Sequence, residues 1–129
     1  MESGKHDRCT IGQRGEDIAC RLLEEKGHTI LERNWRYGHL EIDIISADII
    51  GIHFVEVKAR CRSIQAPPQD NVDRTKQRRV ARAAQAYLRT SRGLPLRNME
   101  CLFDVVAVTF DGPSVYTEFF EQAYMPVYI

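Results

Sequence analysis

Three charged side chains stand in the apolar, strand-like part of this sequence. Asp43 ends one apolar run, and Glu56 and Lys58 lie inside a second one. Such side chains are almost never fully buried unless they are paired, so they need partners, a bound cation or an exposed position at the rim of a sheet. The stretch from Asp43 to Lys58 is therefore a candidate active site.

A fourth candidate, Glu16, lies on the first predicted helix. Helical spacing of apolar residues predicts this helix over residues 11–26, with Gly27 as its end. Glu16 comes three residues before Ala19 and seven before Leu23, so it belongs to their inward face. It is either a third carboxylate of the site or a boundary residue favoured by the helix dipole.

The carboxylates indicate a metal site if they converge. We expect Glu16, Asp43 and Glu56 to meet at one end of the sheet, on the side covered by the first helix. Close carboxylates repel one another unless a divalent cation lies between them, and oxygen ligands favour Mg²⁺ or Mn²⁺. Such a site supports phosphodiester hydrolysis, in which Lys58 would orient water or stabilise transition-state charge. The alternative for Lys58 is an ordinary ion pair with Glu56 or Asp43.

Basic residues cluster after this stretch, although the whole chain has a net charge of zero. Residues 58–92 contain ten Lys or Arg and two Asp, whereas residues 98–129 contain five acids and no Lys or Arg. Local potential attracts a polyanion, so the pattern favours nucleic acid, unless the two segments neutralise each other or the helix is simply solvated. The candidate contacts are Arg60, Arg74, Lys76, Arg78, Arg79 and Arg82.

The remaining pattern predicts a mixed sheet flanked by helices, an α/β fold. A second helix is expected over residues 73–90, and residues 63–71 are expected to form a mobile loop. Trp35 and Tyr37 could stack on a base, but burial in the core is the favoured interpretation. The expected strands are 28–35, 40–47, 52–59, 101–110 and 115–120.

Length and composition bound the class of protein. The chain has 129 residues, of which 43% are hydrophobic, so we expect a single domain over residues 1–129 with a flexible tail at 1–9. No apolar run is long enough to span a membrane and no secretory signal is evident, so a cytoplasmic protein without a membrane partner is expected. The four cysteines are dispersed and the four histidines do not cluster with them, so no structural zinc site is expected.

Several spaced motifs together resemble the bacterial YraN family. The match runs from about Gly12 to Val108, and the usual Gly before Glu-Ile-Asp is Leu40 here. The motifs are Gly12-x-x-Gly15-Glu16-Asp17-x-Ala19, Asn34-Trp35-Arg36, Glu41-Ile42-Asp43-Ile44-Ile45, Phe54-Val55-Glu56-Val57-Lys58-x-Arg60, Lys76-Gln77-Arg78-Arg79, Tyr87-Leu88 and Phe103-Asp104-Val105-Val106.

That family is similar to the PD-(D/E)xK, or restriction endonuclease-like, superfamily. The resemblance puts Asp43 in place of the motif Asp, and Glu56 and Lys58 in place of (D/E)xK. Glu16 corresponds to the helix carboxylate of the archaeal Holliday junction resolvases. The resemblance implies a central mixed sheet, a Mg²⁺ site and nucleic acid as ligand. The roles of Glu41 and Asp104 stay open, with a structural role favoured for Asp104.

Three functional hypotheses follow. The first is a Mg²⁺-dependent endonuclease acting on DNA, especially branched or distorted DNA. The second is a nucleic-acid-binding module of the same fold with little or no catalysis. The third is a protein-interaction or assembly factor that uses the aromatic segment 116–129. Whether two copies pair as a homodimer to cut both strands is left open.

Overall fold

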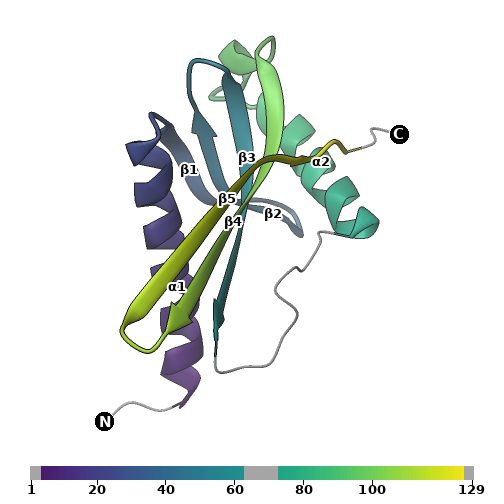
Figure 1. The fold of residues 1–129 in the computed structure, drawn as a ribbon. Helices are drawn as coiled ribbons and strands as arrows, with labels where there is room; N and C mark the ends of the chain where they lie inside the picture. Colours follow the sequence, from purple (N-terminus) through teal and green to yellow (C-terminus); the bar gives the residue numbers. More distant parts are fainter. Residues whose placement is uncertain (1–3, 63–72, 127–129) are drawn as a thin grey trace.

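A five-stranded sheet lies between two helices in the computed structural model (Figure 1), which describes residues 4–62 and 73–126. In chain order the elements are α1 (Gly4–Glu25), β1 (Thr29–Tyr37), β2 (Leu40–Ala47), β3 (Gly51–Cys61), α2 (Arg74–Leu88), the 3₁₀ turn η1 (Leu94–Leu96), β4 (Glu100–Asp111) and β5 (Ser114–Tyr124).

The sheet is mixed, as the sequence predicts. Its spatial order is β1-β2-β3-β4-β5, and only the β3–β4 pair is parallel. Antiparallel neighbours are joined by short turns, whereas the parallel pair requires a crossover, which contains α2. Figure 1 shows α1 and α2 on opposite sides of the sheet. This α/β architecture is consistent with a restriction endonuclease-like fold.

α2 packs against one face of the sheet through small and aromatic side chains. Val80, Ala83 and Ala84 recur at helical spacing and are buried, while the Arg-rich faces of the helix stay outside. Tyr87 is 1% exposed and contacts the ring of Trp35 edge to face, with 5.2 Å between their centroids. Trp35 therefore lies against the core, as the favoured interpretation has it, and Tyr37 beside it is exposed.

α1 covers the opposite face and approaches β3 closely. Ala19 and Leu23 are fully buried against Val55 and Val106. A Cβ atom at Gly15 would lie 2.6 Å from the Cβ of Ala59, closer than real Cβ contacts allow. Glycine at this position lets the helix backbone rest on the strand, and it fixes how near Glu16 comes to the sheet.

Element boundaries differ from the predicted ones mainly at the ends. α1 begins at Gly4, so residues 4–9, which we expected to form a flexible tail, lie in its first turns; residues 1–3 and the expected mobile loop 63–71 lie outside the described residues. β5 extends to Tyr124, four residues past the predicted end. No helix within 4–62 or 73–126 combines the length and apolarity needed to cross a bilayer.

Candidate active site

Asp43 lies where β2 separates from β3. The antiparallel register between these strands runs from Ala47↔Ile52 to Ile44↔Val55 and has no pair at Asp43. At this point the Asp43 side chain replaces the partner strand as hydrogen-bond acceptor: its Oδ2 accepts the backbone N–H of Val57 at 2.8 Å. A partly buried carboxylate is therefore fixed at the fork between two strands.

β1 has an unusual backbone conformation beside the fork. Asn34 has a left-handed φ of 51°, a conformation that asparagine tolerates better than most residues. Arg33 and Asn34 both reach acids of α1, instead of alternating. On the facing strand, Ile42 packs on the α2 side and Ile44 on the α1 side. The prediction that both isoleucines lie on the face opposite Asp43 is therefore wrong.

Neighbouring acids perturb Asp43. Burial, and after it the charges of Glu56, Glu16 and Glu41, raise the pKa of the Asp43 carboxyl to about 6, against the opposing effect of the Val57 N–H. The three acids predicted from sequence therefore lie within electrostatic range of one another, and Glu41 adds a fourth. A titratable group perturbed by burial and by like charges is a recognised mark of a functional site.

Glu16 approaches the fork from α1. Its Oε1 accepts a hydrogen bond from Nδ2 of Asn34 at 3.0 Å and lies 3.5 Å from Nη2 of Arg33. Arg33 also donates to Asp17 at 2.8 Å, so one guanidinium spans two successive acids of the helix. These contacts orient Glu16 toward β1 and partly compensate its charge.

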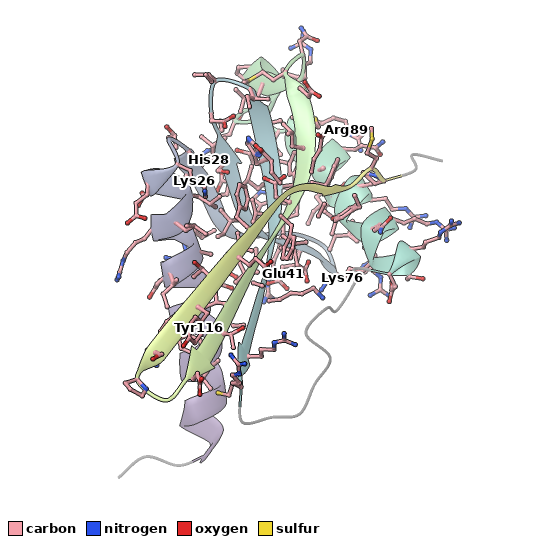
Figure 2. The ribbon with its side chains drawn as sticks, in the orientation of Figure 1. Lys26, His28, Glu41, Lys76, Arg89 and Tyr116 are labelled. Carbon is pink, nitrogen blue, oxygen red and sulfur yellow. The ribbon has the colours of Figure 1, made fainter. Side chains whose placement is uncertain are left out.

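Glu56 approaches from the other side of the sheet, which differs from the expected convergence under α1. It alternates with Val55 and Val57, whose side chains pack on the α1 side. Its Oε2 lies 2.6 Å from Nζ of Lys76, in the first turn of α2. Lys76 was predicted to contact nucleic acid, but here it is the counter-ion of a carboxylate; Figure 2 shows it extending from α2 toward the sheet.

Lys58 lies two residues after Glu56 on β3 and is partly buried. Regular alternation puts it, and Arg60 after it, on the same side of β3 as Glu56. This side of β3 therefore carries Glu56, Lys58 and Arg60 at alternate positions toward the end of the strand. The catalytic role of Lys58 stays a prediction.

The outer surface of α2 is strongly basic. Four of its predicted nucleic-acid contacts are exposed, and three of them follow one another at four-residue spacing along the helix. The helix begins at Asp73, whose Oδ1 accepts the backbone N–H of Lys76 at 2.8 Å and fixes the first turn. The exposed residues are Arg74, Arg78, Arg79 and Arg82.

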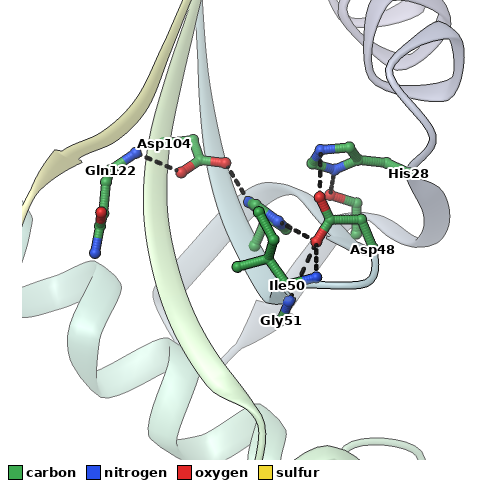
Figure 3. A network of polar contacts seen from close by, with 8 residues as sticks. His28, Asp48, Ile50, Gly51, Asp104 and Gln122 are labelled. Atoms are coloured by element: carbon green, nitrogen blue, oxygen red, sulfur yellow. Dashed lines mark hydrogen bonds and ion pairs between the residues drawn. The ribbon is translucent and has the colours of Figure 1, made fainter.

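A second polar cluster, which sequence reasoning missed, lies at the opposite end of the paired part of β2. We call it the His53 network, and Figure 3 shows it from close by. Nδ1 of His53 lies 2.6 Å from Oδ2 of Asp104, and its Nε2 lies 2.9 Å from Oδ1 of Asp48. Its members are His28, Ser46, Asp48, His53 and Asp104, all of them buried or nearly so.

The pKa values of the two histidines of this network shift in opposite directions. Burial and then the proximity of His53 lower the pKa of His28. Burial also disfavours charge on His53, but its hydrogen bonds to Asp104 and then Asp48 outweigh that effect and raise its pKa. The two carboxylates thus favour the protonated form of His53, in which both ring nitrogens donate, whereas burial favours the neutral form of His28.

Asp104 does not join the fork at Asp43. Its Oδ1 accepts the backbone N–H of Gln122 at 2.9 Å, at a bulge where Gln122 has a φ of 53°. This contact ties β5 to the His53 network and supports the structural role favoured from sequence. The only sequence signal for the network is weak: His53 stands between apolar residues of a strand, where an uncharged side chain is expected.

Comparison with protein-family models identifies the family of this chain. The family model described as "Uncharacterised protein family UPF0102" matches residues 15–108. The chain belongs to this family. The match includes every member of the fork and of the His53 network, and it confirms the resemblance to the YraN-like proteins.

Curated relatives from distant bacteria agree with this assignment. The chain is 45% identical to a UPF0102 protein of Chlorobium chlorochromatii over 100 residues, which cover 78% of this chain and 74% of that relative. It is 36% identical to a UPF0102 protein of Bacteroides thetaiotaomicron over 117 residues, covering 90% and 93%. A UPF0102 protein of Nitratidesulfovibrio vulgaris is 40% identical over 117 residues, covering 91% and 85%.

Proposed function

We propose that this UPF0102 protein is a Mg²⁺- or Mn²⁺-dependent endonuclease that hydrolyses phosphodiester bonds in DNA, with branched or distorted DNA as the preferred class. The observation that carries the proposal is the fork at Asp43. There a partly buried carboxylate accepts one backbone N–H, and its burial, together with the charges of Glu56, Glu16 and Glu41, raises its pKa to about 6. Such a site gains stability when a divalent cation neutralises it.

The donor set fits a hard cation. Asp43, Glu56 and Glu16 offer carboxylate oxygens alone, which suit Mg²⁺ and Mn²⁺ better than softer metals. Lys76 already places a positive charge 2.6 Å from Glu56, which supports the idea that this point of the site requires a cation. When bound, the metal would supply Lewis-acid activation of a phosphate and of a water molecule.

The chain's own residues would position the substrate. Asp43 and Glu56 approach the fork from two strands, so they hold oxygen ligands on a rigid scaffold. Lys58, on the same side of β3 as Glu56, would stabilise the negative charge that develops on the scissile phosphate. The exposed arginines of α2 would contact the phosphate backbone, which orients the duplex without reading its bases.

A second candidate has an observation of its own. The ion pair between Lys76 and Glu56 neutralises one of the carboxylates without a metal. If that pair persists when nucleic acid binds, the chain would act as a binding module of the same fold with little or no turnover. The two candidates share the basic face of α2 and differ only in the fork.

Cleavage assays separate them. Labelled linear, flapped and four-way DNA would be incubated with the protein in Mg²⁺, in Mn²⁺ and in chelator, and products would be resolved on denaturing gels. Asp43→Asn is the informative variant because the amide oxygen can still accept the Val57 N–H. Glu118→Gln, an exposed acid on β5, is the matched control.

We expect metal-dependent cleavage by the wild type and by Glu118→Gln, and none by Asp43→Asn. Equal products from Asp43→Asn and wild type would contradict the catalytic assignment. DNA retention without cleavage by any of the three would favour the binding module. Absence of DNA retention even at low salt would contradict both and favour a protein-interaction factor that uses the exposed side chains Tyr116 and Phe120 of β5. The cytoplasmic location and a homodimer stay predictions.

A further inference from the structure

The His53 network contains three side chains arranged as ligands of a metal ion, independently of Asp43. Nε2 of His28, Nε2 of His53 and a carboxylate oxygen of Asp48 all lie within 4.8 Å of one another. They come from the connection between α1 and β1, from β3 and from the turn between β2 and β3. We propose that these three residues bind a divalent transition-metal ion of the Zn²⁺ type.

The spacing of the three ligand atoms suits a tetrahedral ion. Nε2 of His28 lies 3.5 Å from Oδ2 of Asp48, and Nε2 of His53 lies 2.9 Å from Oδ1 of the same carboxylate. Zn²⁺ bonds of about 2.0–2.1 Å place tetrahedral ligand atoms roughly 3.3 Å apart, between these two distances. Asp48 is 12% exposed, whereas His28 and His53 are 2% and 0% exposed, so water can complete the coordination from the Asp48 side.

The second nitrogen of each imidazole has a partner that points the first toward Asp48. Nδ1 of His28 lies 2.8 Å from the hydroxyl of Ser46, and Nδ1 of His53 lies 2.6 Å from Asp104. Metal-bound histidines have this arrangement, in which a carboxylate or hydroxyl fixes the ring orientation and the tautomer. Asp104 is itself held by the backbone N–H of Gln122.

The ligand types separate this site from the fork. Two imidazole nitrogens and one carboxylate favour Zn²⁺ or Co²⁺, whereas Mg²⁺ prefers oxygen alone. Binding requires Nε2 of His53 without a proton, and Nδ1 can keep its contact with Asp104. The ion would join the α1–β1 connection to the β2–β3 turn and, through Asp104, to β4 and β5. We assign it a stabilising role, distinct from hydrolysis.

Metal titration of the full chain tests the site. Metal-free protein would be titrated with Co²⁺, followed by its visible ligand-field absorption, and then with Zn²⁺ as competitor; thermal unfolding would be recorded with and without Zn²⁺. The variant is His28→Gln and the matched control is His39→Gln, because His39 is exposed in the β1–β2 turn. Ser46→Ala tests the outer contact to His28, and Asp43→Asn tests independence from the fork.

We expect stoichiometric Co²⁺ bands that Zn²⁺ displaces, and a Zn²⁺-dependent rise in the melting temperature. His39→Gln and Asp43→Asn should keep both, His28→Gln should lose both, and Ser46→Ala should bind about 10-fold more weakly. Absence of Co²⁺ bands and of the Zn²⁺ effect in the wild type overturns the site. Wild-type Zn²⁺ affinity in both single variants, Ser46→Ala and His28→Gln, also overturns it. Since Asp43→Asn removes only the proposed cleavage, the two proposals can fail separately.

Discussion

The two ends of the β2–β3 pair hold polar groups in opposite ways. At the fork, the charges of Glu56, Glu16 and Glu41 act on the buried carboxyl of Asp43, and Lys76 contacts Glu56 from an exposed position on α2. In the His53 network, acids and imidazoles alternate, so that each carboxylate faces a donor. Like charges that are held together indicate a ligand supplied from outside, whereas alternating donors and acceptors can stabilise the fold alone and can also bind a borderline metal. Two cations of different chemistry could thus bind one hairpin.

The largest expected effect tests this division directly. Asp43→Asn should lower Mg²⁺-dependent cleavage by about 10³-fold, or about 4 kcal/mol of transition-state stabilisation, because it removes a charged ligand. The same variant should bind Co²⁺ at the His53 network unchanged. Cleavage rates and Co²⁺ absorption measured on one preparation check both. Loss of Co²⁺ binding would show that the two clusters are coupled.

A smaller effect is expected from removing the centre of the second cluster. His53→Ala would leave Asp104, which is fully buried, without its strongest partner, at a cost of about 3 kcal/mol in the free energy of unfolding. Chemical denaturation in chelator measures this cost. His39→Ala, at an exposed turn, should change stability by less than about 0.5 kcal/mol. Similar values for the two variants would show that the network contributes little.

The fork, unlike the His53 network, should lower the free energy of unfolding, by an amount that depends on pH. Folded Asp43 keeps its proton up to about pH 6, whereas in the unfolded chain it releases it near its ordinary pKa of about 4. The folded state therefore binds more protons between these values, and stability falls as pH rises through them. Without metal, Asp43→Asn should be more stable than wild type by about 3 kcal/mol at pH 8 and nearly equal to it at about pH 3, below both pKa values.

Thermal or urea unfolding of both proteins in chelator, at the two pH values, measures this difference. Glu118→Gln serves again as the control and should show no such pH dependence relative to wild type. A variant that is less stable than wild type at pH 8 would mean that the charge of Asp43 is already well compensated. The fork and the His53 network would then not differ in how well their charges are compensated.

The smallest effect concerns the ammonium at the fork. Lys76→Met should change the free energy of unfolding by less than about 1 kcal/mol, since half of the lysine side chain is exposed. Removing this competitor for Glu56 should tighten Mg²⁺ binding several-fold, which isothermal titration measures. Arg82→Met, at an exposed position of α2, is the control. Weaker Mg²⁺ binding in Lys76→Met would show that Lys76 organises the site instead of competing for it.

The sequence predicted the fold better than the detail of the site. Strict alternation in β3 and helical spacing in α2 determine which faces are buried, so the mixed sheet and both helices could be inferred. The left-handed backbone at Asn34 could not, because it depends on a conformation that only the assembled strands impose. The sequence also did not show that Glu16 lies toward β1 while Glu56 lies toward α2.

The His53 network was out of reach for a related reason. Ser46, Asp48 and His53 are close in the chain, but His28 and Asp104 are far from them, and single histidines or aspartates in apolar or turn segments carry no recognisable spacing. Only the crossover through α2 brings Asp104 beside His53. The arginines of α2, by contrast, form a local pattern, and four of them are exposed as expected; Lys76 differs because Glu56 lies within its reach.

Two contacts indicate the order in which the fork and the His53 network form during folding. Val57 donates to Asp43 across 14 residues of chain, whereas the contact between His53 and Asp104 spans 51. Closing the longer loop costs about 1 kcal/mol more in chain entropy, and parallel pairing across a crossover forms slowly. The contact between Val57 and Asp43 can therefore form with the hairpin, as can that between His53 and Asp48, whereas the contact between His53 and Asp104 requires the parallel pair. Hydrogen exchange of the Val57 and Gln122 amides would record that order, with Gln122 opening first.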